Sequence, residues 1–179
     1  GLNHEDWRYA NLRVEKGKFF WLVNLIGIQL MPTILVFLGC LSLYPAISIR
    51  NNSLNYIDII AFSITLFAII IETAADQQLY NFMKNREDPT KNINKGLWKY
   101  SRHPNYFGEI LFWWGLYLFA LATKISFWWM IIGPISITIL FYILSIPLIE
   151  KRNLSRKPDY LQYKKTVSKL IPWFPKQSK

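Results

Sequence analysis

The chain has 179 residues, of which 52% are hydrophobic and 17% aromatic, and its formal net charge is +10. This length predicts one domain over residues 1–179, and the apolar content excludes an ordinary soluble domain. Nucleic-acid binding is not indicated, because Lys and Arg gather in blocks that alternate with apolar stretches. A single cysteine, Cys40, leaves no disulfide within the chain.

Four apolar stretches are long enough to cross a bilayer, which takes about 20 residues. They run approximately over residues 19–44, 54–75, 106–123 and 125–150. We therefore expect an all-α, multi-pass membrane bundle of about four transmembrane helices. Two interfacial elements are also expected, a short helix within residues 1–18 and an amphipathic helix over residues 158–170 of the tail.

The basic residues predict how the bundle lies in the membrane. Lys and Arg concentrate before the first span, between the second and third spans, and in the tail, whereas the two short connections carry only Arg50 and Lys124. Loops rich in Lys and Arg stay in the cytosol. Both termini and residues 76–105 are therefore expected there, and the least regular part of that segment is expected over residues 81–95.

Two stripes of polar side chains mark the cytosolic ends of the second and third spans. Their members are spaced i, i+4, i+8, which places each set on one helix face. The stripes are Glu72, Asp76 and Tyr80 on the second span, and Asn105, Glu109 and Trp113 on the third. We predict that they meet in a pocket with carboxylates on its walls and the nearby Lys and Arg above it. Carboxylates and amides suit ribose hydroxyls, and the cations suit phosphates.

Structural roles also account for several of these residues. Asp76 is placed where a solvated helix end would be, Glu109 could pair with Arg102, and Glu72 could be satisfied between helices. His103 and Pro104 could simply cap the third helix. The two histidines in the chain, His4 and His103, are too few for the clustered imidazole ligands of membrane di-iron enzymes, so no metal is expected.

From Glu72 onward the chain resembles the C-terminal region of the steroid 5-alpha-reductase superfamily. The matching features are Asp76 after an apolar span, Gly96-Leu97-Trp98, Asn105-Tyr106-Phe107-Gly108-Glu109, and the tail from Tyr163 to Ile171-Pro172. The resemblance, which is strongest to bacterial membrane proteins, implies an integral enzyme of the bacterial inner membrane. Such an enzyme uses NADPH to reduce an activated carbon–carbon double bond in a hydrophobic lipid, such as an enone steroid.

The resemblance also assigns residues. Those matching Asp76, Asn105, Tyr106 and Glu109 belong to the cofactor cavity, and the residue matching Tyr163 closes it. We add Glu72, Arg102 and His103 as cofactor-binding candidates, and Arg8 matches loosely a cofactor-contacting arginine. Two departures stand out. Steroid reductases have Asn where Glu72 stands. Their carbonyl-polarising acid and tyrosine lie on earlier spans, so we expect that N-terminal spans of the family fold are missing from this chain. No catalytic residue is therefore assigned.

A second resemblance is to isoprenylcysteine carboxyl methyltransferases. It rests on Arg102-His103-Pro104 with Tyr106, followed by Glu150 and the tyrosine-rich tail. It implies S-adenosylmethionine as the cofactor and His103 as a contact to it. The reductase is preferred because Asp76 and residues 105–109 fit it, whereas the methyltransferase pattern places a Glu pair where Glu150 stands alone. A non-catalytic membrane protein of the same fold is the third hypothesis.

Overall fold

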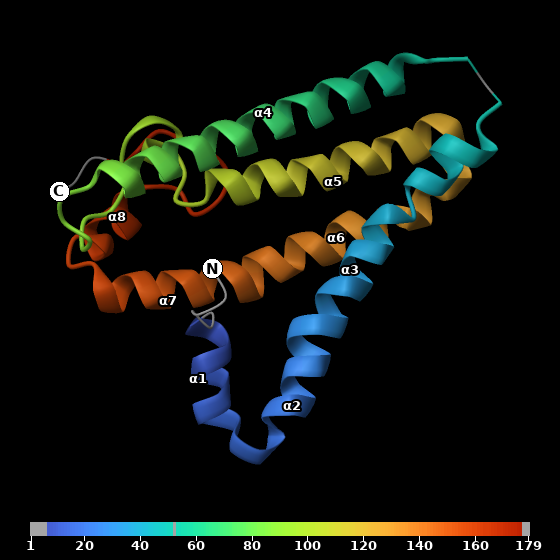
Figure 1. Ribbon diagram of the computed structural model, residues 1–179. Coiled ribbons are helices and arrows are strands. Elements are labelled where there is room, and N and C mark those ends of the chain that lie inside the picture. The colour runs from blue at the N-terminus through green and yellow to red at the C-terminus, as the bar shows by residue number, and fades with distance from the viewer. Residues whose placement is uncertain (1–6, 52, 177–179) are drawn as a thin grey trace.

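The computed structural model describes residues 7–51 and 53–176. Four helical spans in it are long and apolar enough to cross a bilayer, and they run over Leu12–Ile49, Tyr56–Asn85, Pro104–Thr123 and Ile125–Arg156. Apart from an isolated bridge between Ser101 and Ser168, the described residues contain helices and loops without strands. The predicted all-α, multi-pass membrane protein is thereby confirmed (Figure 1).

The first span is assembled from short helical pieces. α1 (Trp7–Lys16) fills the region predicted for an N-terminal helix and ends at a turn through η1 (Gly17–Phe19). The rod then continues through α2 (Phe20–Val23), the π-helix η2 (Asn24–Leu30) and α3 (Met31–Cys40). After η3 (Pro45–Ile49) the chain crosses to the second span. α3 packs against α6, whereas α2 diverges from the bundle (Figure 1).

The second and third spans, α4 (Tyr56–Asn85) and α5 (Pro104–Thr123), pack against each other along most of their length. Gly108 of α5 makes this approach possible, because a Cβ there would lie 2.8 Å from both the Cβ and the backbone nitrogen of Glu72. Small residues commonly allow such close contact between membrane helices. The polar stripes of the two helices are therefore brought together.

α4 begins where Asn55 and Asp58 form a capping box, and the carboxylate of Asp58 also pairs with Arg50. The helix continues beyond the apolar stretch, which stops near residue 75, and ends at Asn85. The reason is that its polar residues still support helical geometry, as in the hydrogen bond from Gln77 Nε2 to Asn81 Oδ1 (2.9 Å). The irregular segment therefore starts later than expected, at Arg86.

The fourth span is one rod of changing helical type. It comprises η5 (Ile125–Ile131), α6 (Ile132–Ile139), the π-helix η6 (Leu140–Ser145) and α7 (Ile146–Arg156). α8 (Tyr160–Thr166) follows, shorter than the amphipathic helix predicted over residues 158–170. The helix stops because the residues after it hydrogen-bond to the loop before α5. The backbone nitrogen of Arg102 donates to the Ser168 carbonyl (2.9 Å), and Ser101 Oγ donates to the Leu170 carbonyl (2.6 Å).

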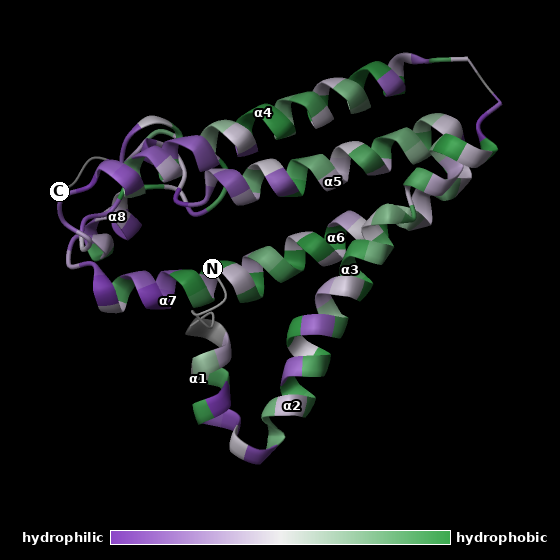
Figure 2. Ribbon diagram, viewed as in Figure 1, coloured by the Kyte–Doolittle hydropathy of each residue, from purple (hydrophilic) through white to green (hydrophobic). Residues whose placement is uncertain are grey.

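The loop between α4 and α5 and the tail after α7 pack together at one end of the bundle, and we call residues 86–103 and 157–176 the headpiece. The loop includes η4 (Gly96–Lys99). Trp98 Nε1 donates to the Ala75 carbonyl (3.0 Å), and the Tyr163 hydroxyl donates to the Trp98 carbonyl (2.5 Å). Figure 2 shows hydrophilic residues gathered at this end and hydrophobic residues along the rods.

Candidate functional site: a carboxylate groove and a buried ion cluster

A cavity of about 720 Å³ opens between α4 and α5 near the headpiece. We call it the carboxylate groove because three of its lining residues are acidic. The lining residues are Ile69, Glu72, Thr73, Asp76, Gln77, Tyr80, Glu109, Phe112 and Trp113. Both predicted polar stripes thus contribute to one cavity, with apolar side chains at its membrane side.

A direct hydrogen bond joins the two stripes beside the groove. Asn105 Nδ2, in the first turn of α5, donates to Asp76 Oδ1 on α4 over 3.0 Å. Asp76 is exposed, so its second oxygen is open to a further donor. The two stripes, which are predicted to share one pocket, are thus in contact at Asp76 and Asn105.

The carboxylates of the groove lie close to one another. Glu72 and Glu109 are half-buried, and their charges and that of Asp76 are close enough to interact. Among the described residues that line the groove, none is Lys or Arg. Carboxylates placed together in this way at membrane depth are costly unless a proton, a hydrogen-bond donor or a cation accompanies them.

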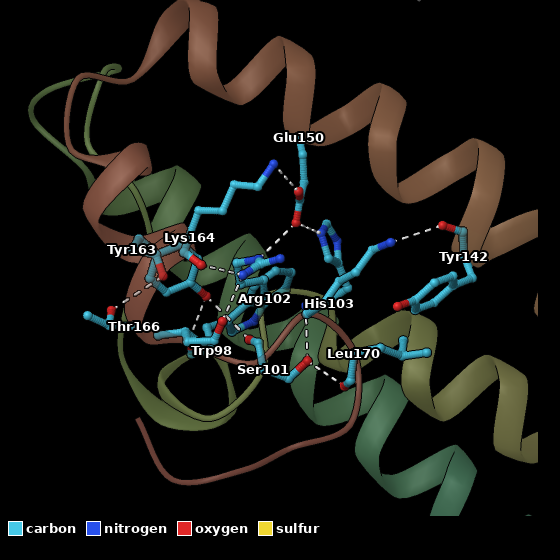
Figure 3. Close-up of polar contacts among 12 residues, drawn as sticks. Trp98, Ser101, Arg102, His103, Tyr142, Glu150, Tyr163, Lys164, Thr166 and Leu170 are labelled. Carbon is cyan, nitrogen blue, oxygen red and sulfur yellow. Dashed lines mark hydrogen bonds and ion pairs between the residues drawn. The ribbon is translucent and has the colours of Figure 1, made fainter. Parts of the chain in front are cut away.

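A second polar site lies across α5, where Arg102 and Glu150 form a buried ion pair (Figure 3). Arg102 Nε donates to Glu150 Oε1 over 2.8 Å. Its Nη1 donates to the carbonyls of Lys164 (2.6 Å) and Val167 (2.8 Å). On the other side, Lys164 Nζ lies 2.9 Å from Glu150 Oε2. The carboxylate is therefore paired at both oxygens.

His103 completes this group, which we call the ion cluster (Arg102, His103, Glu150 and Lys164). Its Nε2 lies 3.4 Å from Glu150 Oε1, and its ring is stacked on that of Tyr106 with centroids 5.6 Å apart. Burial lowers the pKa of His103 below its ordinary value, and the neighbouring Glu150 opposes this only in part. Burial therefore favours the neutral imidazole.

The family to which the chain belongs follows from comparison with known proteins. A family model described as "Protein of unknown function (DUF1295)" matches residues 2–167. The chain belongs to this family. It is also 26% identical over 191 residues to uncharacterized protein C594.04c of Schizosaccharomyces pombe, a match that covers 94% of this chain and 55% of the yeast protein. The chain thus spans about half the length of that relative, and no solved structure matches it.

The predicted site residues of this DUF1295 chain divide into two groups instead of surrounding one pocket. Glu72, Asp76 and Glu109 line the groove, and Asn105 is bonded to its edge. The others belong to the far side of α5 or to the headpiece: Arg102, His103, Tyr106 and Tyr163. The side chain of Arg8 lies outside the described residues.

Two expectations are corrected by this division. Glu109 does not pair with Arg102, and Arg102 does not cover the groove, since its guanidinium is bonded to Glu150 and to two tail carbonyls. The physical reason is the start of α5: Asn105 and Glu109 face α4, whereas the residues before Pro104 turn toward α7. Tyr106 also faces away from α4, because its ring contacts His103 and Phe141.

Sequence reasoning missed the partners of the ion cluster. The sequence pattern relates Glu150 only to a methyltransferase Glu pair, and it assigns no role to Lys164 or Ser101. A carboxylate at the end of an apolar span that is followed by basic residues was the available signal. Ser101 has no such signal, because its role depends on the tail: its Oγ accepts from the His103 backbone nitrogen (3.1 Å) and donates to the tail.

Proposed function

We propose that the chain acts as a membrane oxidoreductase that uses NADPH to reduce an activated carbon–carbon double bond of a lipid or steroid-like substrate. The observation that carries the proposal is the Asn105–Asp76 hydrogen bond beside a groove with two further carboxylates. The sequence resemblance implies that Asp76, Asn105 and Glu109 belong to a cofactor cavity. The residue pattern and the geometry of the groove thus both support the reductase proposal.

The groove fits the sugar and amide parts of such a cofactor. Asp76, Glu72 and Glu109 would accept hydrogen bonds from ribose hydroxyls, and Asn105 Oδ1 would accept one from a carboxamide. When bound, NADPH supplies the hydride. Its phosphates need cations that the groove lining lacks, and the exposed Lys95 and Lys99 in the loop before α5 are the residues we propose for them.

The apolar residues of the groove suit a substrate that arrives from the bilayer. Ile69, Phe112 and Trp113 lie on the membrane side of the carboxylates. They would hold the hydrocarbon part of the substrate and exclude water from the reacting carbon. We further propose that the headpiece faces the cytosol, where NADPH is available. The basic residues concentrated in the headpiece and at the adjoining helix ends support this orientation.

Cofactor binding by the full chain in detergent tests the proposal. We expect isothermal titration to give micromolar affinity for NADPH, and Asn105→Ala and Asp76→Asn to weaken it about tenfold, the effect of losing one charge-assisted hydrogen bond. Glu87→Gln is the matched control, because it removes a carboxylate from an exposed loop position. Equal loss in the control, or no NADPH binding at all, contradicts the reductase.

A methyltransferase that uses S-adenosylmethionine is the second candidate, and one observation favours it. A groove with three carboxylates and no described Lys or Arg in its lining suits a sulfonium cation better than it suits phosphates. Methyl transfer also requires mainly positioning. Tight S-adenosylmethionine binding without an NADPH response would decide for this candidate, and binding of neither would favour a non-catalytic role.

A further inference from the structure

A second cavity lies on the opposite side of α5 from the carboxylate groove, and no step of the proposed function uses it. Its volume is about 570 Å³, and we call it the basic cavity. Its lining residues are Arg102, Pro147, Glu150, Lys151, Leu154, Ser155, Lys164 and Lys169. We propose that the basic cavity binds the phosphate headgroup of an anionic membrane lipid.

The charge balance of the cavity favours an anionic occupant. Glu150 is the acidic member of its lining, and Arg102 and Lys164 already pair with this carboxylate. Lys151 and Lys169 therefore add positive charge that no lining carboxylate offsets. The exposed Glu15 of α1 interacts electrostatically with Lys151, but the cations around the cavity still outnumber the two carboxylates. A phosphate group would compensate this excess.

Lys169 is held in place rather than free in solvent. Its Nζ donates to the Tyr142 carbonyl over 3.1 Å and lies 3.6 Å from the centroid of the Tyr142 ring. Tyr142 belongs to η6 and is exposed on the bundle surface. The ammonium of this cavity-lining residue is thus held against the exposed Tyr142. A fixed cation loses little conformational freedom when it binds an anion.

The surface next to the cavity supports a lipid rather than a soluble phosphate. Along the rod toward the membrane centre, Ile143, Leu144 and Leu148 are 61%, 50% and 47% exposed. Pro147 and Leu154 continue this apolar surface into the cavity wall. A lipid would place its headgroup among the lysines and its acyl chains along these residues. Basic pockets between helices at the membrane surface are suited to such headgroups.

Lipid titration of the full chain, followed by native mass spectrometry, tests this inference. The probes are phosphatidylglycerol, which is anionic, and phosphatidylcholine, which is zwitterionic. We expect phosphatidylglycerol to bind about tenfold more tightly, and the double variant Lys151→Gln/Lys169→Gln to remove that preference. Lys84→Gln/Lys91→Gln is the matched control, since it removes the same charge from exposed positions outside the cavity and should leave binding unchanged.

Two further measurements make the outcome unambiguous. Lys151→Arg/Lys169→Arg should retain the preference, because the cationic charge is kept. If the glutamine double variant fails to fold, Lys151→Gln alone, at an exposed position, should still weaken phosphatidylglycerol binding severalfold. Equal binding of both lipids, or equal loss in the control variant, overturns the inference. Displacement of the lipid by inorganic phosphate or by NADPH assigns the cavity to a soluble phosphate and overturns it too.

Discussion

The carboxylate groove and the ion cluster both contain carboxylates at the same end of the bundle, but these carboxylates have different surroundings. Glu150 is 4% exposed, and both of its oxygens lie within 3 Å of a cationic nitrogen. Glu72 and Glu109 are half-buried beside open space, with no described Lys or Arg in the groove lining. The carboxylate of the cluster is thus paired with cations within the chain, whereas the described lining of the groove offers its carboxylates no cation. This contrast separates a structural carboxylate from a candidate ligand site.

Neutralising one carboxylate in each site should separate the two roles most clearly. Glu150→Gln leaves the buried Arg102 without its counterion and should lower the free energy of unfolding by about 3–5 kcal/mol. Glu109→Gln should change it by no more than about 0.5 kcal/mol, because it removes repulsion rather than attraction. Denaturation in detergent measures both. Similar losses in the two variants would mean that the groove carboxylate is also structural.

Gly108→Ala tests whether the groove depends on close helix packing. The added methyl group would meet the side chain and the backbone of Glu72 at 2.8 Å, so we expect a loss of about 1–3 kcal/mol from overpacking. Gly27→Ala is the matched control, because a Cβ there meets nothing within 4 Å. Cofactor binding should fall with Gly108→Ala and not with Gly27→Ala. Unchanged stability and binding in the first variant would contradict the packing argument.

Tyr163 offers a smaller test of how the headpiece is held. Tyr163→Phe removes the hydrogen bond to the Trp98 carbonyl and should cost about 1 kcal/mol. Burial raises the pKa of Tyr163, so the hydroxyl form is favoured in the folded state. The contribution of the Tyr163 hydroxyl to the free energy of unfolding is complete below about pH 10 and is lost as the pH rises above that value. Limited proteolysis of the tail against pH should show the alkaline loss in the native protein and a weaker dependence in the variant.

The pH dependence of His103 tests the burial of the ion cluster. Its folded-state pKa is lowered by burial, so protons bind the unfolded chain more readily. Stability is therefore complete above about pH 6.5 and declines as the pH falls below it, by about 1.4 kcal/mol for each unit that separates the two pKa values. Unfolding measured between pH 5 and 7 should show this slope, and His103→Gln should remove it. If the pH dependence of stability persists in His103→Gln, another titrating group causes it.

Part of this architecture could be predicted from the sequence and part could not. The four spans follow from continuous apolar stretches, and the contact of Asp76 with Asn105 follows from helical spacing on two neighbouring rods. The pairing of Arg102 with Glu150 could not be derived, because 48 residues separate them and the tail must first return to the loop before α5. The pattern also predicts irregular structure from residue 81, whereas α4 continues to Asn85. Apolarity stops near residue 75, but helical geometry does not depend on it.

The bridge between Ser101 and Ser168 also sets an order of events during biosynthesis. Arg102 leaves the ribosome well before Glu150 and the carbonyls of Lys164 and Val167, so its guanidinium stays hydrated until the last helices have been made. A polypeptide that stops before residue 160 would lack the carbonyls of Lys164 and Val167 that Arg102 contacts. The contacts that close this end of the protein therefore form only once the tail has been made as far as Leu170.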